Sequence, residues 1–323
     1  MADTKIEWCD KVWNPVRGCS LVSEGCRNCY AMKQAHRFSG PGKPYEDLTE
    51  LGPNGPRWNG KVRLVPELLD APLRWRKPQR IFVNSMSDLF HEAVPPGFIR
   101  AVIQSALLAI KERGHTFIFL TKRAGRMLWY LHAEADTVFQ GYLAHEPRMQ
   151  FGVSVENQPT ADDRVPKLLR CPVATRIVSY EPALELVDFS PWLPVESIGG
   201  VEFENWLDQI IAGGESGPGA RPSHPDWFRS ARDEAVAARV PFFFNQRGEW
   251  TWDKDGGGKT PATHMICQHG AITQNPIWER GIFHNHPAHE PHDIYAIARV
   301  GKKAAGRLLD GREWNEFPKT GNR

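Results

Sequence analysis

Short apolar runs alternate with segments of helical periodicity over most of the chain. Six runs of four or five residues predict buried strands at 80–84, 116–120, 151–155, 175–179, 209–212 and 240–244. Apolar residues three and four positions apart predict helices at 98–113, 126–132, 161–169 and 225–238. This alternation indicates βαβ units, and therefore an α/β fold built on a parallel sheet.

The two ends of the chain depart from this pattern. Proline and glycine residues predict a loop over 8–30 and an irregular surface segment over 39–60, with a helix at 31–38 between them. After residue 252 the alternation stops. We therefore expect one domain over 1–252 that contains all six strands.

A C-terminal extension over 253–323 is expected to pack on that domain. It is irregular in pattern, and its last part predicts one basic helix at 298–309.

Polar and glycine-rich segments follow each predicted strand. Parallel sheets bind their ligands at the carboxyl ends of strands, so six such ends could surround one shared site. The alternative is that these segments are polar only because they are exposed. They lie at 84–88, 121–123, 156–158, 180–182, 213–217 and 245–248.

Composition predicts a folded protein that stays in the cytoplasm. Hydrophobic residues make up 41% and charged residues 24% of the 323 residues, which is ordinary globular usage. No apolar run reaches the roughly 18 residues of a membrane span, and the first ten residues lack an apolar signal-peptide core. We expect no membrane partner. The net charge is only +2, so contact with nucleic acid would depend on a local basic patch.

The spacing of three cysteines is the strongest chemical signal. Cys19, Cys26 and Cys29 fall within eleven residues, and thiolates bind soft metals. Three thiolates on a [4Fe-4S] cluster would leave one iron open to a small ligand. Two alternatives remain: a structural zinc site with Cys9 as its fourth ligand, or buried cysteines that bind no metal. Histidines cluster at 264–269 and 284–292, where a solvated loop is favoured over a metal site.

Several motifs resemble one protein family over nearly the whole chain. They are TKIEW at 4–8, WNP at 13–15, GC at 18–19, GCRNCYA at 25–31, VNSMSDLF at 83–90, GGESG at 213–217 and GKKAAGRLLD at 301–310. They resemble the phage-associated Gp37/Gp68 family, which looks like a divergent branch of the radical S-adenosylmethionine superfamily. The resemblance implies a partial (β/α) barrel of six parallel strands, with the cysteine loop at its N-terminus.

Two features depart from the superfamily. Its usual first cysteine spacing has three intervening residues, whereas six separate Cys19 from Cys26 here. Position 9 is a cysteine, where family members usually have a hydroxyl residue. The longer spacing requires a larger loop around the cluster, and Cys9 keeps the zinc alternative open.

The resemblance also implies cofactors and a mechanism. The open iron of the [4Fe-4S] cluster would chelate S-adenosyl-L-methionine, and the radical derived from it would take a hydrogen atom from the substrate. An electron donor such as flavodoxin or ferredoxin would be required.

Cofactor contacts are implied at the strand ends. The assignments are Ser87 and Asp88 to the methionine amino group, Lys122 to its carboxylate, Ser154 and Glu156 to the ribose hydroxyls, and Gly213 and Gly214 to the adenosyl group, with Glu215 beside them. Asp88 could instead cap the following turn, and Glu215 could pair with Arg221. No catalytic residue is assigned.

The substrate follows only from the resemblance to phage proteins. Phages modify their DNA bases, and radical chemistry can rearrange unreactive carbon skeletons. We therefore expect a phage-encoded enzyme in the host cytoplasm that isomerises an amino-acid group appended to a modified thymine in DNA. The alternatives are a lyase that repairs damaged pyrimidines, or a zinc-stabilised, non-catalytic nucleic-acid-binding protein.

Overall fold

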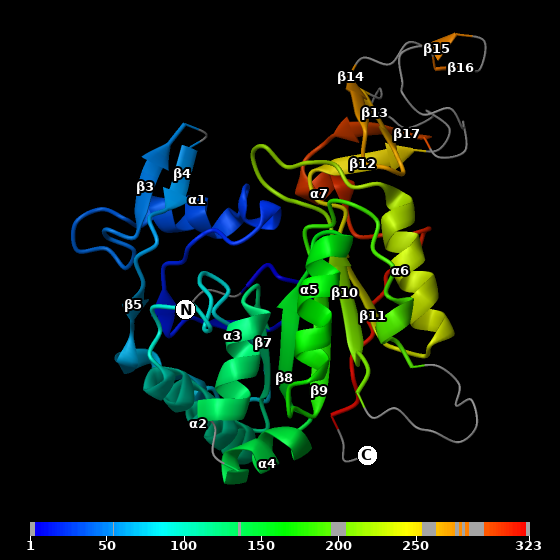
Figure 1. Ribbon diagram of the computed structural model, residues 1–323. Coiled ribbons are helices and arrows are strands. Elements are labelled where there is room, and N and C mark those ends of the chain that lie inside the picture. Colours follow the sequence, from blue (N-terminus) through cyan, green and yellow to red (C-terminus); the bar gives the residue numbers. More distant parts are fainter. Residues whose placement is uncertain are drawn as a thin grey trace, which may run out of the picture.

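One curled sheet of parallel strands forms the centre of the computed structural model (Figure 1). The structure describes residues 4–53, 55–134, 137–194, 205–253, 263–274, 278–279, 282–283 and 294–320. The sheet has seven strands in the order β1-β6-β7-β8-β9-β10-β11, and every neighbouring pair is parallel. The strands are β1 (Lys11–Trp13), β6 (Arg80–Val83), β7 (Thr116–Thr121), β8 (Met149–Ser154), β9 (Thr175–Tyr180), β10 (Gln209–Gly213) and β11 (Phe242–Gln246).

This sheet confirms the predicted α/β class and the partial barrel. The six predicted strands correspond to β6 through β11. The seventh strand, β1, lies inside the segment predicted as a loop, and that prediction is corrected. Only three residues pair, Lys11 to Trp13 with Ile81 to Val83, so the run is too short to show periodicity.

Helices cover the convex face of the sheet. They are α2 (Pro96–Arg113), α3 (Ala124–Trp129), a π-helical turn (Tyr130–Glu134), α4 (Thr137–His145), α5 (Gln158–Leu169) and α6 (Pro225–Ala237). Side chains alternate across each strand, so that Phe117 and Phe119 of β7 pack in the main core while Ile118 faces the other side. The predicted helices in this region are confirmed, whereas α4 was not predicted.

The concave face changes from apolar to polar along the strands. Ile118, Ile177 and Phe243 form a second apolar cluster there with Trp8 and Cys9. Two residues beyond Ile177 the same face presents Ser179, and two beyond Phe243 it presents Asn245. The interior is therefore closed by apolar side chains towards one end and lined by polar groups where the strands end.

The N-terminal part of the chain lies beside those strand ends. It contains β2 (Val16–Arg17), a 3-10 turn (Glu24–Cys26), α1 (Tyr30–Arg37), β3 (Thr49–Gly52), β4 (Gly55–Trp58), β5 (Arg63–Leu64) and two further 3-10 turns (Pro66–Leu68 and Ala71–Arg74). Helix α1 confirms the helix expected at 31–38. The segment 39–60 is not wholly irregular, because β3 and β4 form a hairpin.

The C-terminal part forms a small antiparallel sheet above the barrel (Figure 1). Its order is β12-β17-β13-β14, and β15 pairs with β16. The C-terminal elements are β12 (Trp250–Asp253), β13 (His264–Cys267), β14 (Ile272–Gln274), β15 (Trp278–Glu279), β16 (Ile282–Phe283), β17 (Ile294–Arg299) and α7 (Lys302–Ala305). One further 3-10 turn (Ser190–Trp192) lies earlier in the chain, between β9 and β10.

The predicted basic helix at 298–309 is wrong. Residues 294–299 form β17, and α7 spans four residues between Gly301 and Gly306, both of which have positive φ. The chain then returns to the barrel, where Phe317 packs on Phe243 at 5.1 Å. The division into 1–252 and 253–323 stays a prediction, and β12 crosses that boundary. Within the described residues, no helix combines the length and apolar character of a membrane span.

Candidate functional site

The three cysteines gather where the strands end. Cys26 closes the 3-10 turn, Cys29 is the residue before α1, and Gly18 makes a β-bridge with Ser87 after β6. The Cys19 thiol interacts electrostatically with the thiols of Cys26 and Cys29, so the three lie near one another. All six cysteines of the chain are free thiols. Burial raises the pKa of Cys19 to about 12 and also raises that of Cys29.

Glu156, just after β8, is the first group that holds this loop. Its carboxylate accepts a hydrogen bond from Ser23 Oγ at 2.9 Å and forms ion pairs with Lys122 and with Arg164, whose Nη1 is 3.1 Å away. Burial alone would raise the pKa of Glu156, but Lys122 and Arg164 outweigh it and keep the pKa below its usual value. A Cβ on Gly25 would lie 2.4 Å from Glu156 Cγ, so the loop approaches this closely only because residue 25 is glycine.

Glu215, after β10, is the second. Asn28, between Cys26 and Cys29, donates from Nδ2 to Glu215 Oε2 at 2.9 Å. Arg221 pairs with the same carboxylate at 2.7 Å and donates to the backbone oxygen of Glu24 at 2.9 Å. The alternative of a Glu215–Arg221 ion pair is therefore confirmed. The pair binds the cysteine loop at two points, Asn28 and the backbone oxygen of Glu24.

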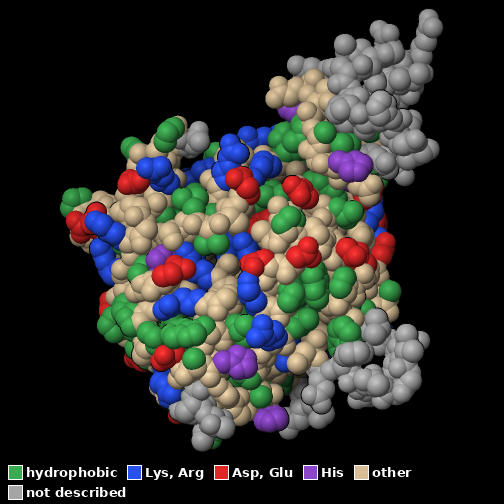
Figure 2. Space-filling view, viewed as in Figure 1, with side chains coloured by type: hydrophobic (Ala, Val, Ile, Leu, Met, Phe, Trp, Pro, Cys, Tyr) green, Lys and Arg blue, Asp and Glu red, His purple; other side chains and the backbone are tan. Residues whose placement is uncertain are grey.

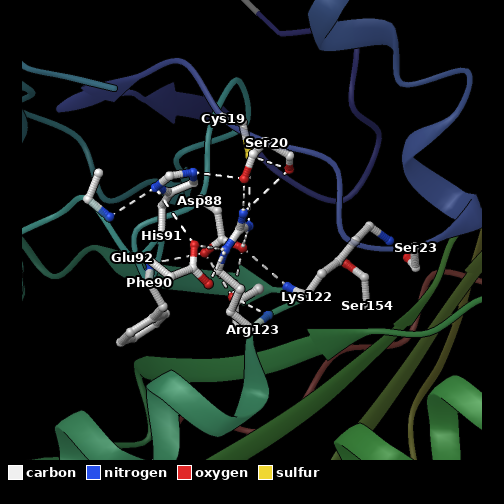
Figure 3. A network of polar contacts seen from close by, with 12 residues as sticks. Cys19, Ser20, Ser23, Asp88, Phe90, His91, Glu92, Lys122, Arg123 and Ser154 are labelled. Carbon is white, nitrogen blue, oxygen red and sulfur yellow. Dashed lines mark hydrogen bonds and ion pairs between the residues drawn. The ribbon is translucent and has the colours of Figure 1, made fainter. Parts of the chain in front are cut away.

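Asp88, after β6, is the third (Figure 3). The carboxylate is 5% exposed and accepts from Phe90 N at 2.9 Å, from Thr121 Oγ1 at 2.8 Å and from Arg123 Nη1 at 3.0 Å. The contact with Phe90 N caps the turn, as the alternative reading had it. This internal hydrogen bonding makes Asp88 a structural anchor of the strand end, and its contact with a methionine amino group stays a prediction.

Arg123 connects Asp88 to the first cysteine. Its Nη1 lies 3.8 Å from Cys19 Sγ, and its Nη2 donates to Ser20 Oγ at 2.7 Å. Ser20 Oγ is also 2.9 Å from His91 Nε2. Because His91 Nδ1 accepts from Ala93 N, the hydrogen is on Nε2, and burial and Arg123 lower the His91 pKa, which favours this neutral form.

The other predicted cofactor residues are also in the site. Ser87 Oγ donates to the backbone oxygen of Val16 at 2.7 Å, and Lys122 is paired with Glu156. Ser154 is partly exposed at the end of β8, beside Lys122 in Figure 3. The structure thus brings all the predicted strand-end residues to one edge, while their contacts with a cofactor stay predictions.

Close packing explains why two adjacent residues are glycines: Gly213, which ends β10, and Gly214, which follows it. A Cβ on Gly213 would lie 2.1 Å from Glu181 Oε1, and one on Gly214 would lie 2.2 Å from the backbone oxygen of Arg247. Both glycines are buried, so they are required here whether or not an adenosyl group approaches.

Three polar residues inside the barrel lie in the strand-end segments predicted to surround the site, but they were given no individual role. Glu181 follows β9, and Asn245 donates to it from β11 at 2.6 Å. Asn84, after β6, is 2% exposed and has φ of 61°, and neither of its side-chain polar atoms has a hydrogen-bond partner among the described residues. The signal for these residues in the sequence was their position, because each lies one or two residues after an apolar residue of a strand.

Cysteine thiolates could hold a single metal ion or a cluster at this site. Within the described ranges, no three His, Cys, Asp or Glu side chains converge to hold one metal ion. In a four-iron cluster each thiolate binds a different iron atom, so its sulfurs need not converge on one point. Cys9 packs in the apolar cluster with Trp8, and the charged groups that act on its thiol are Asp10 and Arg80. Histidines 284–292 lie outside the described residues.

Comparison with known proteins identifies the family but no activity. A family model described as a protein of unknown function (DUF5131) matches residues 3–318. The chain belongs to this DUF5131 family. No curated protein and no solved structure matches it.

The close contact between Gly25 and Glu156 predicts that the stability of this DUF5131 protein depends on having no side chain at position 25. Gly25→Ala should lower the free energy of unfolding by about 1–3 kcal/mol, because the added Cβ forces the loop off the buried carboxylate. Gly97→Ala is the matched control: a Cβ there meets nothing within 4 Å, so stability should hold or rise slightly. Urea unfolding of both variants checks this, and equal stability of the two variants would contradict it.

The lowered pKa of Glu156 predicts how stability depends on pH. The carboxylate contributes stability above its unfolded value of 4.5, and this contribution is lost as the pH falls through the lower folded value. Glu156→Gln should cost about 3–5 kcal/mol at pH 7, because it leaves Lys122 and Arg164 without their counter-charge.

The measurement is urea unfolding of parent and variant between pH 7 and pH 3. The gap between the two should be widest above pH 5 and narrow below pH 4.5. A gap that does not change with pH would show that Glu156 is not ionised in the folded protein.

Proposed function

We propose that this protein is a radical S-adenosylmethionine enzyme whose [4Fe-4S] cluster is bound by Cys19, Cys26 and Cys29. The observation that carries the proposal is the position of three free thiols on one loop that buried carboxylates fix to the carboxyl ends of a parallel half-barrel. This is the edge at which parallel α/β sheets bind ligands. When bound, the cluster and S-adenosylmethionine would supply one-electron chemistry that the side chains cannot.

The chain's own residues would position and shield that chemistry. Glu156 and Glu215 hold the two halves of the cysteine loop, through Ser23 and Asn28 respectively. Arg123 places a buried positive charge beside Cys19, which lowers the Cys19 pKa and so opposes part of the rise that burial causes. Asp88 keeps that guanidinium in place, so its role in the proposal is to orient Arg123.

Iron content tests the proposal. Anaerobic reconstitution should give about four irons per chain, and changing Cys19, Cys26 or Cys29 to Ala should each remove most of the iron. Cys9→Ser and Cys171→Ala are matched controls, because both thiols are buried in apolar clusters that do not include the other three cysteines, and they should keep full iron content. A colourless protein that binds one zinc, lost in Cys9→Ser, would favour the nucleic-acid-binding alternative.

For the substrate, we propose a modified thymine in DNA, isomerised at its appended amino-acid group, with repair by a lyase as the alternative. Lys and Arg side chains gather in the upper middle of the face in Figure 2, on the side where the strands end. Arg229 and Arg232 pair with Asp310, and Arg221 pairs with Glu215. Lys302 and Lys303 lie on the short helix α7, where Lys303 is exposed, and we propose that they contact the DNA backbone.

Nucleoside analysis of modified phage DNA tests this choice. Reduced enzyme should change the retention time of the modified nucleoside without changing its mass, and deuterium from the appended group should appear in 5′-deoxyadenosine. A lyase would change the mass. Turnover of a free nucleotide or a peptide, with no change in any modified DNA, would refute the DNA-base substrate and leave the cluster assignment intact.

A further inference from the structure

The inside of the half-barrel holds a polar pair that the cysteine loop does not use. Asn245 Nδ2 donates to Glu181 Oε1 at 2.6 Å, across the intervening strand β10. Asn245 is 6% exposed, yet its Oδ1 has no hydrogen-bond partner among the described residues. Buried amide oxygens are nearly always paired, so this one is available to a bound ligand or an ordered water.

The local backbone is shaped to bring this pair together. The register between β10 and β11 shifts after Ala212, and such irregularities re-aim side chains near binding sites. The adjacent Gly213 leaves room for the Glu181 carboxyl, since a Cβ there would be 2.1 Å from Oε1. The pair therefore depends on two deviations from a regular strand at one point of the sheet.

Glu181 can act as a hydrogen-bond donor in this setting. Burial raises its pKa, although the hydrogen bond from Asn245 and the charge of Lys302 on α7 oppose the shift. The raised pKa favours the protonated carboxyl, whose hydroxyl is a donor. In its protonated form Glu181 would place a donor beside an acceptor, Asn245 Oδ1.

Tyr30 connects this pair to the cysteine loop. It is the first residue of α1, follows Cys29 directly, and interacts electrostatically with both Cys29 and Glu181. Its hydroxyl donates to the backbone oxygen of Ser85 at 2.7 Å, which fixes the ring, and the side chain is still 45% exposed. A fixed, exposed aromatic ring is a surface on which a flat ligand can stack.

We propose that Glu181 and Asn245 bind the hydrogen-bonding edge of a nucleobase. A pyrimidine presents a carbonyl beside an N–H, and adenine presents a ring nitrogen beside an amino group. Either edge would accept from the Glu181 hydroxyl and donate to Asn245 Oδ1, which is how enzymes read an extruded base. The base could belong to a DNA substrate or to the adenosyl group of the cofactor. The inference rests on the proposed function for its biological meaning, but the site needs no metal to be tested.

Binding of free nucleosides to the full-length, metal-free protein tests the site. Equilibrium dialysis would compare thymidine with N3-methylthymidine, and adenosine with N6,N6-dimethyladenosine. We expect one parent nucleoside to bind at least tenfold more tightly than its blocked analogue. Preference for thymidine identifies a substrate base, and preference for adenosine identifies the cofactor. Binding of neither nucleoside, or equal binding of the blocked analogues, overturns the proposal even if the protein assembles a cluster.

Variants of the pair separate hydrogen bonding from general packing. Asn245→Leu and Glu181→Ala should each weaken binding at least tenfold. Glu181→Gln keeps a neutral donor and should bind within about threefold of the parent, whereas a site that needs a carboxylate would lose binding in this variant. If circular dichroism shows Asn245→Leu to be unfolded, Asn245→Ser replaces it. Unchanged binding in both Asn245→Ser and Glu181→Ala would exclude the pair.

Discussion

The structure depends on burying negative charge at the carboxyl ends of its parallel strands. Asp88, Glu156 and Glu215 are each almost fully buried, which is tolerable only because each has a cationic partner and several hydrogen bonds. Those partners and donors come from the N-terminal loop as well as from the barrel. A loop with little regular structure of its own is thereby tied to the edge of the sheet at several separate points.

The polar groups of the site form two layers that differ in how fully they are hydrogen-bonded. The outer layer consists of charged groups that satisfy one another and hold the cysteine loop. The inner layer contains Glu181, Asn245 and Asn84, and some of its polar atoms have no partner. In the described structure, Asn245 Oδ1 and both side-chain polar atoms of Asn84 are buried without a hydrogen bond. Unsatisfied groups mark where a ligand is needed, whereas satisfied ion pairs mark where the fold is held. In the proposed enzyme, cofactor and substrate would meet over the inner layer.

The sequence was sufficient for the strands and for the edge of the sheet that carries the site, because apolar runs and strand ends are local features. It was not sufficient for the roles of the charged residues there. Glu215 meets Asn28 across 187 positions, and Asp88 meets Arg123 across 35, so neither pairing leaves a local pattern. For the same reason β1 was missed: three residues form a strand only because β6 lies beside them. The basic helix at 298–309 was predicted too long because the prediction relied on its charged residues. Gly301 and Gly306, both with positive φ, limit α7 to four residues.

We propose that the anchored loop would hold a cluster through Cys19, Cys26 and Cys29, with one iron left open to S-adenosylmethionine. Electron paramagnetic resonance of the reconstituted, dithionite-reduced protein, recorded with and without S-adenosylmethionine, tests this most directly. We expect the signal of a reduced [4Fe-4S] cluster, with g values that shift when S-adenosylmethionine is added because it would bind the open iron. A cluster signal that S-adenosylmethionine leaves unchanged would contradict an open iron, and a protein that assembles no cluster would contradict the whole assignment.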